Sequence, residues 1–109
     1  MQPHQVPTVS PADVADEVLL DVREHDEWAA GRAPLAVHLP MSQIADRFAE
    51  IPAGRPLSVI CKVGGRSAQV TAWLIQNGVE ARNVAGGMFA WDAAGLPLVG
   101  DSDQPWVLG

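Results

Sequence analysis

The only cysteine of the chain, Cys61, lies where an apolar run meets a glycine pair, in the segment ICKVGGRSA. A lone cysteine is often no more than a small buried apolar residue. Here Gly64 and Gly65 follow it, and glycine adopts φ > 0, which lets successive backbone N–H groups turn toward one anion. Such groups favour the thiolate, which is the nucleophilic form of cysteine. The segment therefore predicts a nucleophile in an anion-binding loop.

The elements around this loop strengthen the prediction. Cys61 follows an apolar run at 57–60 and precedes a helical pattern at 66–77. In open α/β sheets, ligands bind where the carboxyl ends of strands lead into helices. The helix dipole adds partial positive charge at that place, and Lys62 and Arg66 add full charges. The loop is not a phosphate-binding P-loop, which needs a Gly-Lys-Ser/Thr end at a longer spacing.

Five short apolar runs alternate with helical segments along the chain. The runs predicted as strands are residues 6–9, 18–20, 36–39, 57–60 and 81–84. The predicted helices are a short one beginning at Ser10 and Pro11, then residues 24–30, 42–51 (with Ser42 as its cap), 66–77 and 88–94. Apolar strands that alternate with helices are typical of a parallel sheet covered on both faces. The sequence predicts an α/β fold, with a mostly parallel central sheet of about five short strands flanked by helices on both faces.

Composition limits the classes of function. The chain has 109 residues, of which 48% are apolar, and a net charge of −6. This predicts one domain over 1–109, with a core at about 7–98 and a C-terminal tail at 99–109. Trp106 of the tail is expected to pack back onto the body, with a contact to a partner as the alternative. The negative charge argues against nucleic-acid and anionic-membrane partners. One cysteine makes no internal disulfide and no cysteine–histidine zinc site, so no metal or other cofactor is predicted, and the absence of a signal peptide favours a cytoplasmic location.

Several motifs, taken together, resemble a known family. They are DVRE at 21–24, the Glu27-Trp28 pair, AAGRAPLAVHLP at 29–40, CKVGGRSA at 61–68 and NVAGGMFAWDAAGLP at 83–97. In this order and spacing they resemble a single-domain rhodanese, a thiosulfate sulfurtransferase, over about residues 7–98. The chain departs from the family's Gly-His-Ile-x-Gly-Ala segment, where it has Gly31-Arg32-Ala33 and Leu35. That departure concerns the local backbone rather than the nucleophile.

The resemblance implies a rhodanese-like fold and a mechanism. Cys61 would attack the outer sulfur of thiosulfate or a similar donor, release sulfite and become a persulfide, which then passes its sulfur to cyanide or a thiol. The active-site loop implied in substrate binding comprises Lys62, Val63, Gly64, Gly65, Arg66 and Ser67. Their backbone N–H groups would hold the anionic terminal sulfur. Lys62 is either a guide for the sulfonate or a solvated loop residue, and Arg66 is expected to anchor the loop through a specific partner.

Three further residues match supporting positions of the family: Asp21, Arg23 and Glu27. Arg23 is expected to bind a carboxylate and to hold these motifs together near the site, in a structural role. The tryptophans Trp28, Trp73 and Trp91 are interpreted as core or pocket walls. The histidines His4, His25 and His38 lack ligand spacing and are interpreted as surface or turn residues.

Two alternatives differ in class. A small phosphatase or arsenate reductase uses a related cysteine–arginine loop, but with five residues between the two, whereas four separate Cys61 from Arg66. The shorter loop suits one sulfur atom better than a phosphoryl group, and Ile60 stands where those enzymes usually have histidine. The other alternative is a persulfide carrier or protein-interaction module that serves an acceptor protein and does not use thiosulfate as its true donor. A monomer or weak dimer is expected.

Overall fold

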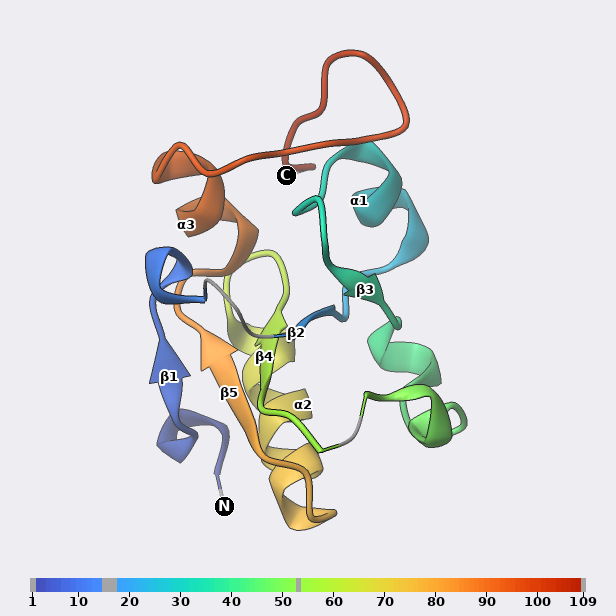
Figure 1. The fold of residues 1–109 in the computed structure, drawn as a ribbon, viewed down its shortest axis with the longest axis vertical. Helices are drawn as coiled ribbons and strands as arrows, with labels where there is room; N and C mark the ends of the chain where they lie inside the picture. Colours follow the sequence, from blue (N-terminus) through green and yellow to red (C-terminus); the bar gives the residue numbers. More distant parts are fainter. Residues whose placement is uncertain (1, 15–17, 53, 109) are drawn as a thin grey trace.

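A computed structural model describes residues 2–14, 18–52 and 54–108 and contains one five-stranded sheet, shown in Figure 1. The strands are β1 (Thr8–Val9), β2 (Val18–Asp21), β3 (Val37–His38), β4 (Leu57–Ile60) and β5 (Ala81–Val84). They lie in the order β1-β5-β4-β2-β3, and every neighbouring pair is parallel. The predicted parallel α/β sheet is confirmed.

The described residues also form three α-helices and four 3-10 helices; one 3-10 helix precedes the first strand, one α-helix follows the last, and the others lie between strands. The α-helices are α1 (His25–Ala30), α2 (Gly65–Gln76) and α3 (Gly87–Ala93); the 3-10 helices are η1 (Pro3–Gln5), η2 (Pro11–Asp13), η3 (Met41–Gln43) and η4 (Phe48–Glu50). The short helix predicted at Ser10 and Pro11 is thus one 3-10 turn, and residues 15–17 beyond it lie outside the described residues. No helix within the described residues is both long and apolar enough to cross a membrane.

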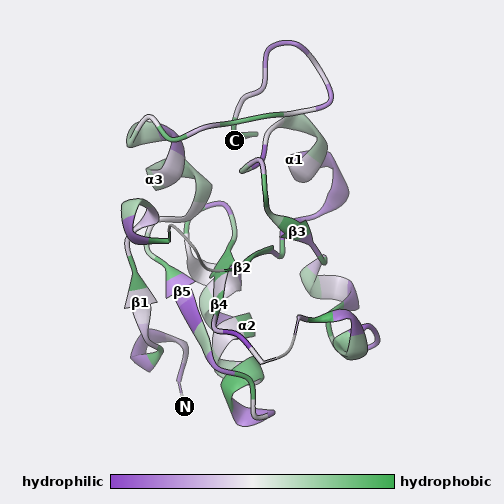
Figure 2. Ribbon diagram, in the orientation of Figure 1, coloured by the Kyte–Doolittle hydropathy of each residue, from purple (hydrophilic) through white to green (hydrophobic). Residues whose placement is uncertain are grey.

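The sheet has a hydrophobic core on each face, because neighbouring strand residues point to opposite sides. Leu19 and Leu20 of β2, for example, belong to different clusters. One cluster packs against α2 and contains Leu20, Leu57, Val59, Val70 and Leu74. The other packs against α3 and contains Leu19, Ile60, Val84, Met88 and Trp91. In Figure 2, α2 mixes hydrophobic and hydrophilic residues, as a helix with one buried side does. The two clusters show that helices cover both faces, as predicted.

The helix predicted at 42–51 is wrong. The segment forms η3 and η4, joined by a turn and bounded by Pro40 and Pro52. The Ser42 hydroxyl donates to the Glu24 carboxylate at 3.1 Å and does not cap a helix. The apolar spacing correctly indicated which residues face the core, since Ile44 and Ile51 are buried. However, only eleven residues lie between the two prolines, and so short a helix is marginally stable by itself.

The chain after α3 runs across the carboxyl end of the sheet toward α1 (Figure 1), and the predicted tail begins beside α1. Backbone hydrogen bonds hold it there: Val99 and Arg32 exchange N–H···O bonds of 2.7 and 2.9 Å, and Trp106 N donates to Ala30 O at 3.1 Å. One ion pair adds to them, between Arg32 Nη1 and Asp101 Oδ1 at 3.0 Å. The Trp106 side chain is 54% exposed, so the prediction that it packs onto the body is wrong. Val107 is the buried residue of the tail, and the last residue, 109, lies outside the described residues.

Candidate active site

The Cys61 loop connects the end of β4 to the start of α2 at the carboxyl edge of the sheet. Cys61 is 1% exposed, since the core on the α2 face surrounds it. Gly64 lies in the left-handed region with φ of +108°, a conformation that strongly favours glycine. Gly65 does not have positive φ, contrary to the expectation for both glycines, because it is already the first residue of α2. One left-handed residue is enough to turn the chain into the helix.

The start of α3 fixes the outer side of this loop. Met88 N donates to Cys61 O at 2.8 Å, and Phe89 N donates to Lys62 O at 3.1 Å. A Cβ atom on Gly87 would lie 2.5 Å from Cys61 O, so only glycine permits this approach. With two loop carbonyls held by α3, the N–H groups that follow are directed toward the sulfur. The second glycine pair of the sequence therefore shapes the Cys61 loop.

The Cys61 sulfur lies among hydrogen-bond donors of the loop and of the first turn of α2. Gly64 N lies 3.1 Å from Sγ, and the Ser67 hydroxyl oxygen lies 3.2 Å from it. Burial raises the pKa of the thiol, but hydrogen bonds from the Ser67 hydroxyl and from the N–H groups of Ser67, Gly64 and Val63 lower it by more, so the pKa lies below its usual value. The loop thus favours the thiolate.

Arg66 links α2 to α1 through Glu27. Its Nη1 and Nη2 atoms lie 2.7 and 2.8 Å from the two oxygens of the Glu27 carboxylate, which is a bidentate geometry. The hydrogen bond from Arg66 lowers the pKa of Glu27, and burial opposes it only in part. The side chains are 34% and 14% exposed, respectively. Glu27 is the specific partner that Arg66 was expected to have.

Arg23 also binds a carboxylate, but within its own motif. Its Nη2 lies 2.8 Å from Oδ2 of Asp21, and both side chains are completely buried. Arg23 reaches α1 through backbone carbonyls, with Nη1 donating to Glu27 O at 3.2 Å and Nη2 to Gly31 O at 2.7 Å. It therefore joins β2 to both ends of the Glu27–Gly31 segment, while the Glu27 carboxylate is left for Arg66.

Lys62 lies at the rim of the loop. Its Nζ lies 5.4 Å from the centre of the Phe89 ring, a cation–π contact, and no carboxylate pairs with it among the residues that the structure describes. Phe89 and Val63 are both exposed large apolar side chains. The rim of the loop therefore combines one positive charge with two apolar side chains.

Asn83 is a buried polar residue that sequence reasoning missed. Its Oδ1 lies 2.5 Å from the Ser67 hydroxyl oxygen, and its Nδ2 donates to Gly64 O at 3.2 Å. It stands in β5, opposite Val59 of β4, two residues before Cys61. An asparagine in a predicted inner strand, just before a glycine pair, was the available signal.

The aromatic residues are placed partly as expected. Trp91 is buried, and Trp73 and Trp28 are half-buried. Trp28 stacks on His38, with ring centres 4.5 Å apart. His38 Nε2 lies 2.8 Å from Arg23 O. No group of three or more metal-ligating side chains occurs among the described residues.

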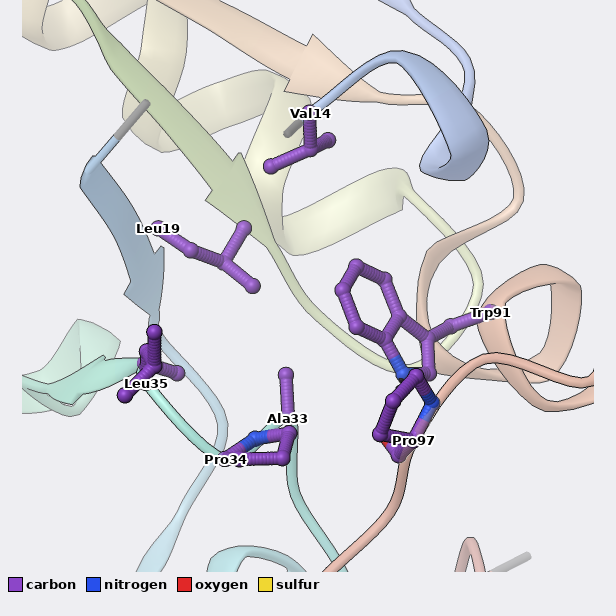
Figure 3. A pocket seen from close by; sticks show the side chains of 8 residues that line it. Val14, Leu19, Ala33, Pro34, Leu35, Trp91 and Pro97 are labelled. Carbon is purple, nitrogen blue, oxygen red and sulfur yellow. Dashed lines mark hydrogen bonds between the residues drawn. The ribbon is translucent and has the colours of Figure 1, made fainter. Parts of the chain in front are cut away.

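A cavity of about 260 Å³ lies elsewhere, on the α3 face (Figure 3). Its lining residues are Val14, Leu19, Ala33, Pro34, Leu35, Ala36, Trp91 and Pro97. The side chains are apolar, and the indole N–H of Trp91 is bonded to Pro97 O at 2.8 Å. None of the lining side chains is a nucleophile or an acid–base group, so this cavity is not a rival to the Cys61 loop as the candidate active site.

Comparison with known proteins identifies the family of the chain. A family model described as Rhodanese-like domain matches residues 10–94. A sulfurtransferase of Allochromatium vinosum is 43% identical over 89 residues, covering 81% of this chain and 83% of that protein. Thiosulfate sulfurtransferase GlpE of Pseudomonas savastanoi pv. phaseolicola is 35% identical over 77 residues, covering 70% and 73%. The crystal structure of a rhodanese-related protein from Thermoplasma volcanium has a TM-score of 0.81 at 29% identity, covering 85% of this chain and 97% of that one. The chain belongs to the rhodanese-like family.

Proposed function

We propose that this protein is a sulfurtransferase that moves a sulfane sulfur from thiosulfate, or a similar donor, to a thiol or cyanide through a persulfide on Cys61. One observation carries the proposal: the Cys61 sulfur, at the start of α2, accepts hydrogen bonds from Gly64 N and the Ser67 hydroxyl. These donors stabilise a thiolate. The resemblance to named sulfurtransferases supports the class of reaction.

The chemistry proceeds in two half-reactions. The Cys61 thiolate attacks the outer sulfur of thiosulfate, a new S–S bond forms, and sulfite leaves with the electron pair of the broken S–S bond. The negative charge then resides on the terminal sulfur, about 2 Å from Sγ. A thiolate or cyanide attacks that sulfur, and the electron pair of the Cys61 persulfide bond returns to Sγ. No proton donor is needed, because both leaving groups are stable anions.

The N–H groups at the start of α2 are suited to hold the terminal sulfur. The first residues of an α-helix have no carbonyl partner within the helix, and α2 begins at Gly65. We assign Arg66 to anchoring this loop end through Glu27. Lys62 is free of a carboxylate partner within the described part of the chain and is assigned to attracting the anionic donor.

The geometry favours sulfur transfer over phosphate chemistry. In addition to the four-residue spacing, two terminal nitrogens of Arg66 are already bound to Glu27. An arginine that clamps a phosphoryl group needs those donors for the ligand. A buried sulfur also suits a donor that delivers one atom.

A second candidate is sulfur delivery to an acceptor protein. It is favoured by the rim of the loop, where exposed Val63 and Phe89 lie beside the Lys62 ammonium. Apolar side chains next to a cation fit a partner that presents its thiol on an apolar surface with an acidic border.

Intact-mass spectrometry tests the proposal. Thiosulfate is expected to add one sulfur atom to the wild type and none to Cys61→Ser, and subsequent cyanide should remove it. Because the chain has one cysteine, the site of loading is unambiguous. A wild type that stays unmodified by thiosulfate, while turning over p-nitrophenyl phosphate in a Cys61-dependent way, would establish the phosphatase instead. Loading by another persulfide donor, without loading by thiosulfate, would establish the carrier.

A further inference from the structure

The Ser67 hydroxyl has one proton and two acceptors. Its oxygen lies 3.2 Å from Cys61 Sγ and 2.5 Å from Asn83 Oδ1. Ser67 is completely buried and Asn83 is buried as well. A serine hydroxyl donates one hydrogen bond at a time. The sulfur and the amide oxygen therefore compete for the same proton.

The orientation of the Asn83 amide follows from its other contact. Gly64 O lies 3.2 Å from Nδ2, and a carbonyl oxygen can only accept, so the NH₂ group must face Gly64. The amide oxygen consequently faces Ser67, and it too can only accept. At 2.5 Å, two oxygens without a proton between them would repel. Ser67 therefore donates to Asn83 whenever Sγ is not a negatively charged acceptor.

We propose that Asn83 is a positioning residue that takes the Ser67 hydroxyl bond when negative charge leaves the Cys61 sulfur. On the free thiolate, Ser67 donates to Sγ. When the sulfur carries a proton, the thiol S–H can point to the Ser67 oxygen and the hydroxyl donates to Asn83. In the persulfide, which rests on the proposed function, the charge lies on the terminal sulfur, Sγ is a weak neutral acceptor, and the hydroxyl again donates to Asn83.

Asn83 therefore acts against the free thiolate and in favour of the thiol and the persulfide. Removing its oxygen leaves Ser67 with one acceptor, the sulfur, and the thiolate gains a full hydrogen bond without a competitor. The loss of Nδ2 is tolerable, because Gly64 O also accepts a hydrogen bond from Ala68 N at 3.1 Å. The effect must pass through Ser67.

The pH dependence of alkylation by iodoacetamide tests this without any sulfur donor. The lone cysteine makes the reaction rate a direct report on Cys61. For Asn83→Leu we expect the midpoint of the rate–pH profile to move down by about one unit, the size of one neutral-to-charged hydrogen-bond difference. In a Ser67→Ala background the same substitution should leave the midpoint unchanged.

Two outcomes overturn the proposal: an unchanged or higher midpoint in Asn83→Leu, or an equal downward shift with and without Ser67. The second would mean that Asn83 acts on the Gly64 backbone alone. If Asn83→Leu does not fold by circular dichroism, Asn83→Asp serves, because it keeps an acceptor and adds charge. Its midpoint should rise, and by more with Ser67 present than in the Ser67→Ala background; an equal rise overturns the proposal.

A second measurement uses the persulfide. At equilibrium in the same mixture of thiosulfate and sulfite, at a pH above both alkylation midpoints, the fraction of Asn83→Leu that carries the extra sulfur should be several-fold lower than in the wild type, since the free thiolate has gained stability. A wild type that is never loaded contradicts the proposed function and leaves the alkylation result to decide the role of Asn83. An equal loaded fraction in both proteins overturns the persulfide part of the proposal.

Discussion

Two arginine–carboxylate pairs lie at the carboxyl edge of the sheet, and they differ in burial. Arg23 and Asp21 belong to one strand-end motif and have no exposed side-chain surface. Arg66 and Glu27 come from different helices, and their side chains are 34% and 14% exposed. Both pairs have nitrogen–oxygen distances of 2.7 to 2.8 Å. Two pairs with similar shortest distances therefore lie in two different environments.

The environments decide what each pair does. Water cannot replace a lost partner in the buried pair, so each charge there depends on the other. Arg23 also satisfies the carbonyls of Glu27 and Gly31, which makes it part of the support of α1. The partly exposed pair can be hydrated when it opens, so it contributes little to stability. What it determines is the position of the loop end that begins α2.

The largest expected effect is on stability, at Arg23. Arg23→Met should lower the free energy of unfolding by about 3–5 kcal/mol, because it leaves the Asp21 carboxylate buried without its partner. Urea unfolding followed by circular dichroism measures this. Arg47→Met is the matched control: Arg47 pairs with Glu50 at 2.8 Å on the exposed surface, so its loss should change little. If Arg23→Met and Arg47→Met were equally stable, burial would not make the Arg23–Asp21 pair more important for stability than an exposed pair.

The next effect is on reactivity, at Arg66. Arg66→Gln should lower the rate of sulfur loading of Cys61 by about tenfold, equivalent to roughly 1.4 kcal/mol of activation free energy, because the loop end loses its anchor and its charge. Its stability should fall by less than about 1 kcal/mol. Mass spectrometry of samples quenched at successive times measures the loading rate, and urea unfolding measures the free energy of unfolding. A variant that lost stability as much as Arg23→Met, with unchanged loading, would reverse the roles assigned to the pairs.

The two pairs also show which features of the structure can be predicted from neighbouring residues in the sequence. The parallel sheet was predictable because each apolar run is short and bounded by helical pattern, and the Cys61 loop because cysteine, glycine pair and arginine are contiguous. Arg23 could be expected to bind a carboxylate. Its partner is Asp21, two residues away, whereas Glu27 binds Arg66, 39 residues further along the chain. This choice of partners depends on how α1 and α2 pack, which the sequence does not show.

The predictions that were wrong, and the site residue that was missed, also depend on contacts between distant segments. Ser42 has the chemistry of a helix cap, but the fold brings the Glu24 carboxylate to its hydroxyl. Trp106 has the largest apolar side chain of the tail, yet the backbone contacts of the tail place Val107 inward instead. Asn83 becomes part of the site only because β5 pairs with β4. Each of these outcomes rests on a contact between segments that the sequence does not bring together.

The smallest effect expected is the pH dependence of the Arg66–Glu27 pair. The pKa of Glu27 is lowered below its ordinary value of 4.5, chiefly by the hydrogen bond from Arg66. Between the folded and the ordinary pKa the unfolded chain binds more protons than the folded protein. The stability from this pair is therefore fully present above the ordinary value and is lost as the pH falls through the folded value. At neutral pH it should amount to less than about 1 kcal/mol, since the pair is partly hydrated.

Glu27→Gln isolates this contribution. Urea unfolding at neutral pH should find the variant slightly less stable than the wild type, and the difference should shrink as the pH falls below the ordinary Glu27 pKa of 4.5 and the folded-state carboxylate becomes protonated. In an Arg66→Gln background the substitution should show a weaker pH dependence, because the largest cause of the lowered pKa of Glu27 is gone and only the Glu24 N–H and the charge of Arg23 still lower it. A difference that grew as the pH fell would mean that Glu27 is destabilised as a carboxylate. The partly exposed pair would then resemble an unpaired buried charge, and its contrast with the Arg23–Asp21 pair would not hold.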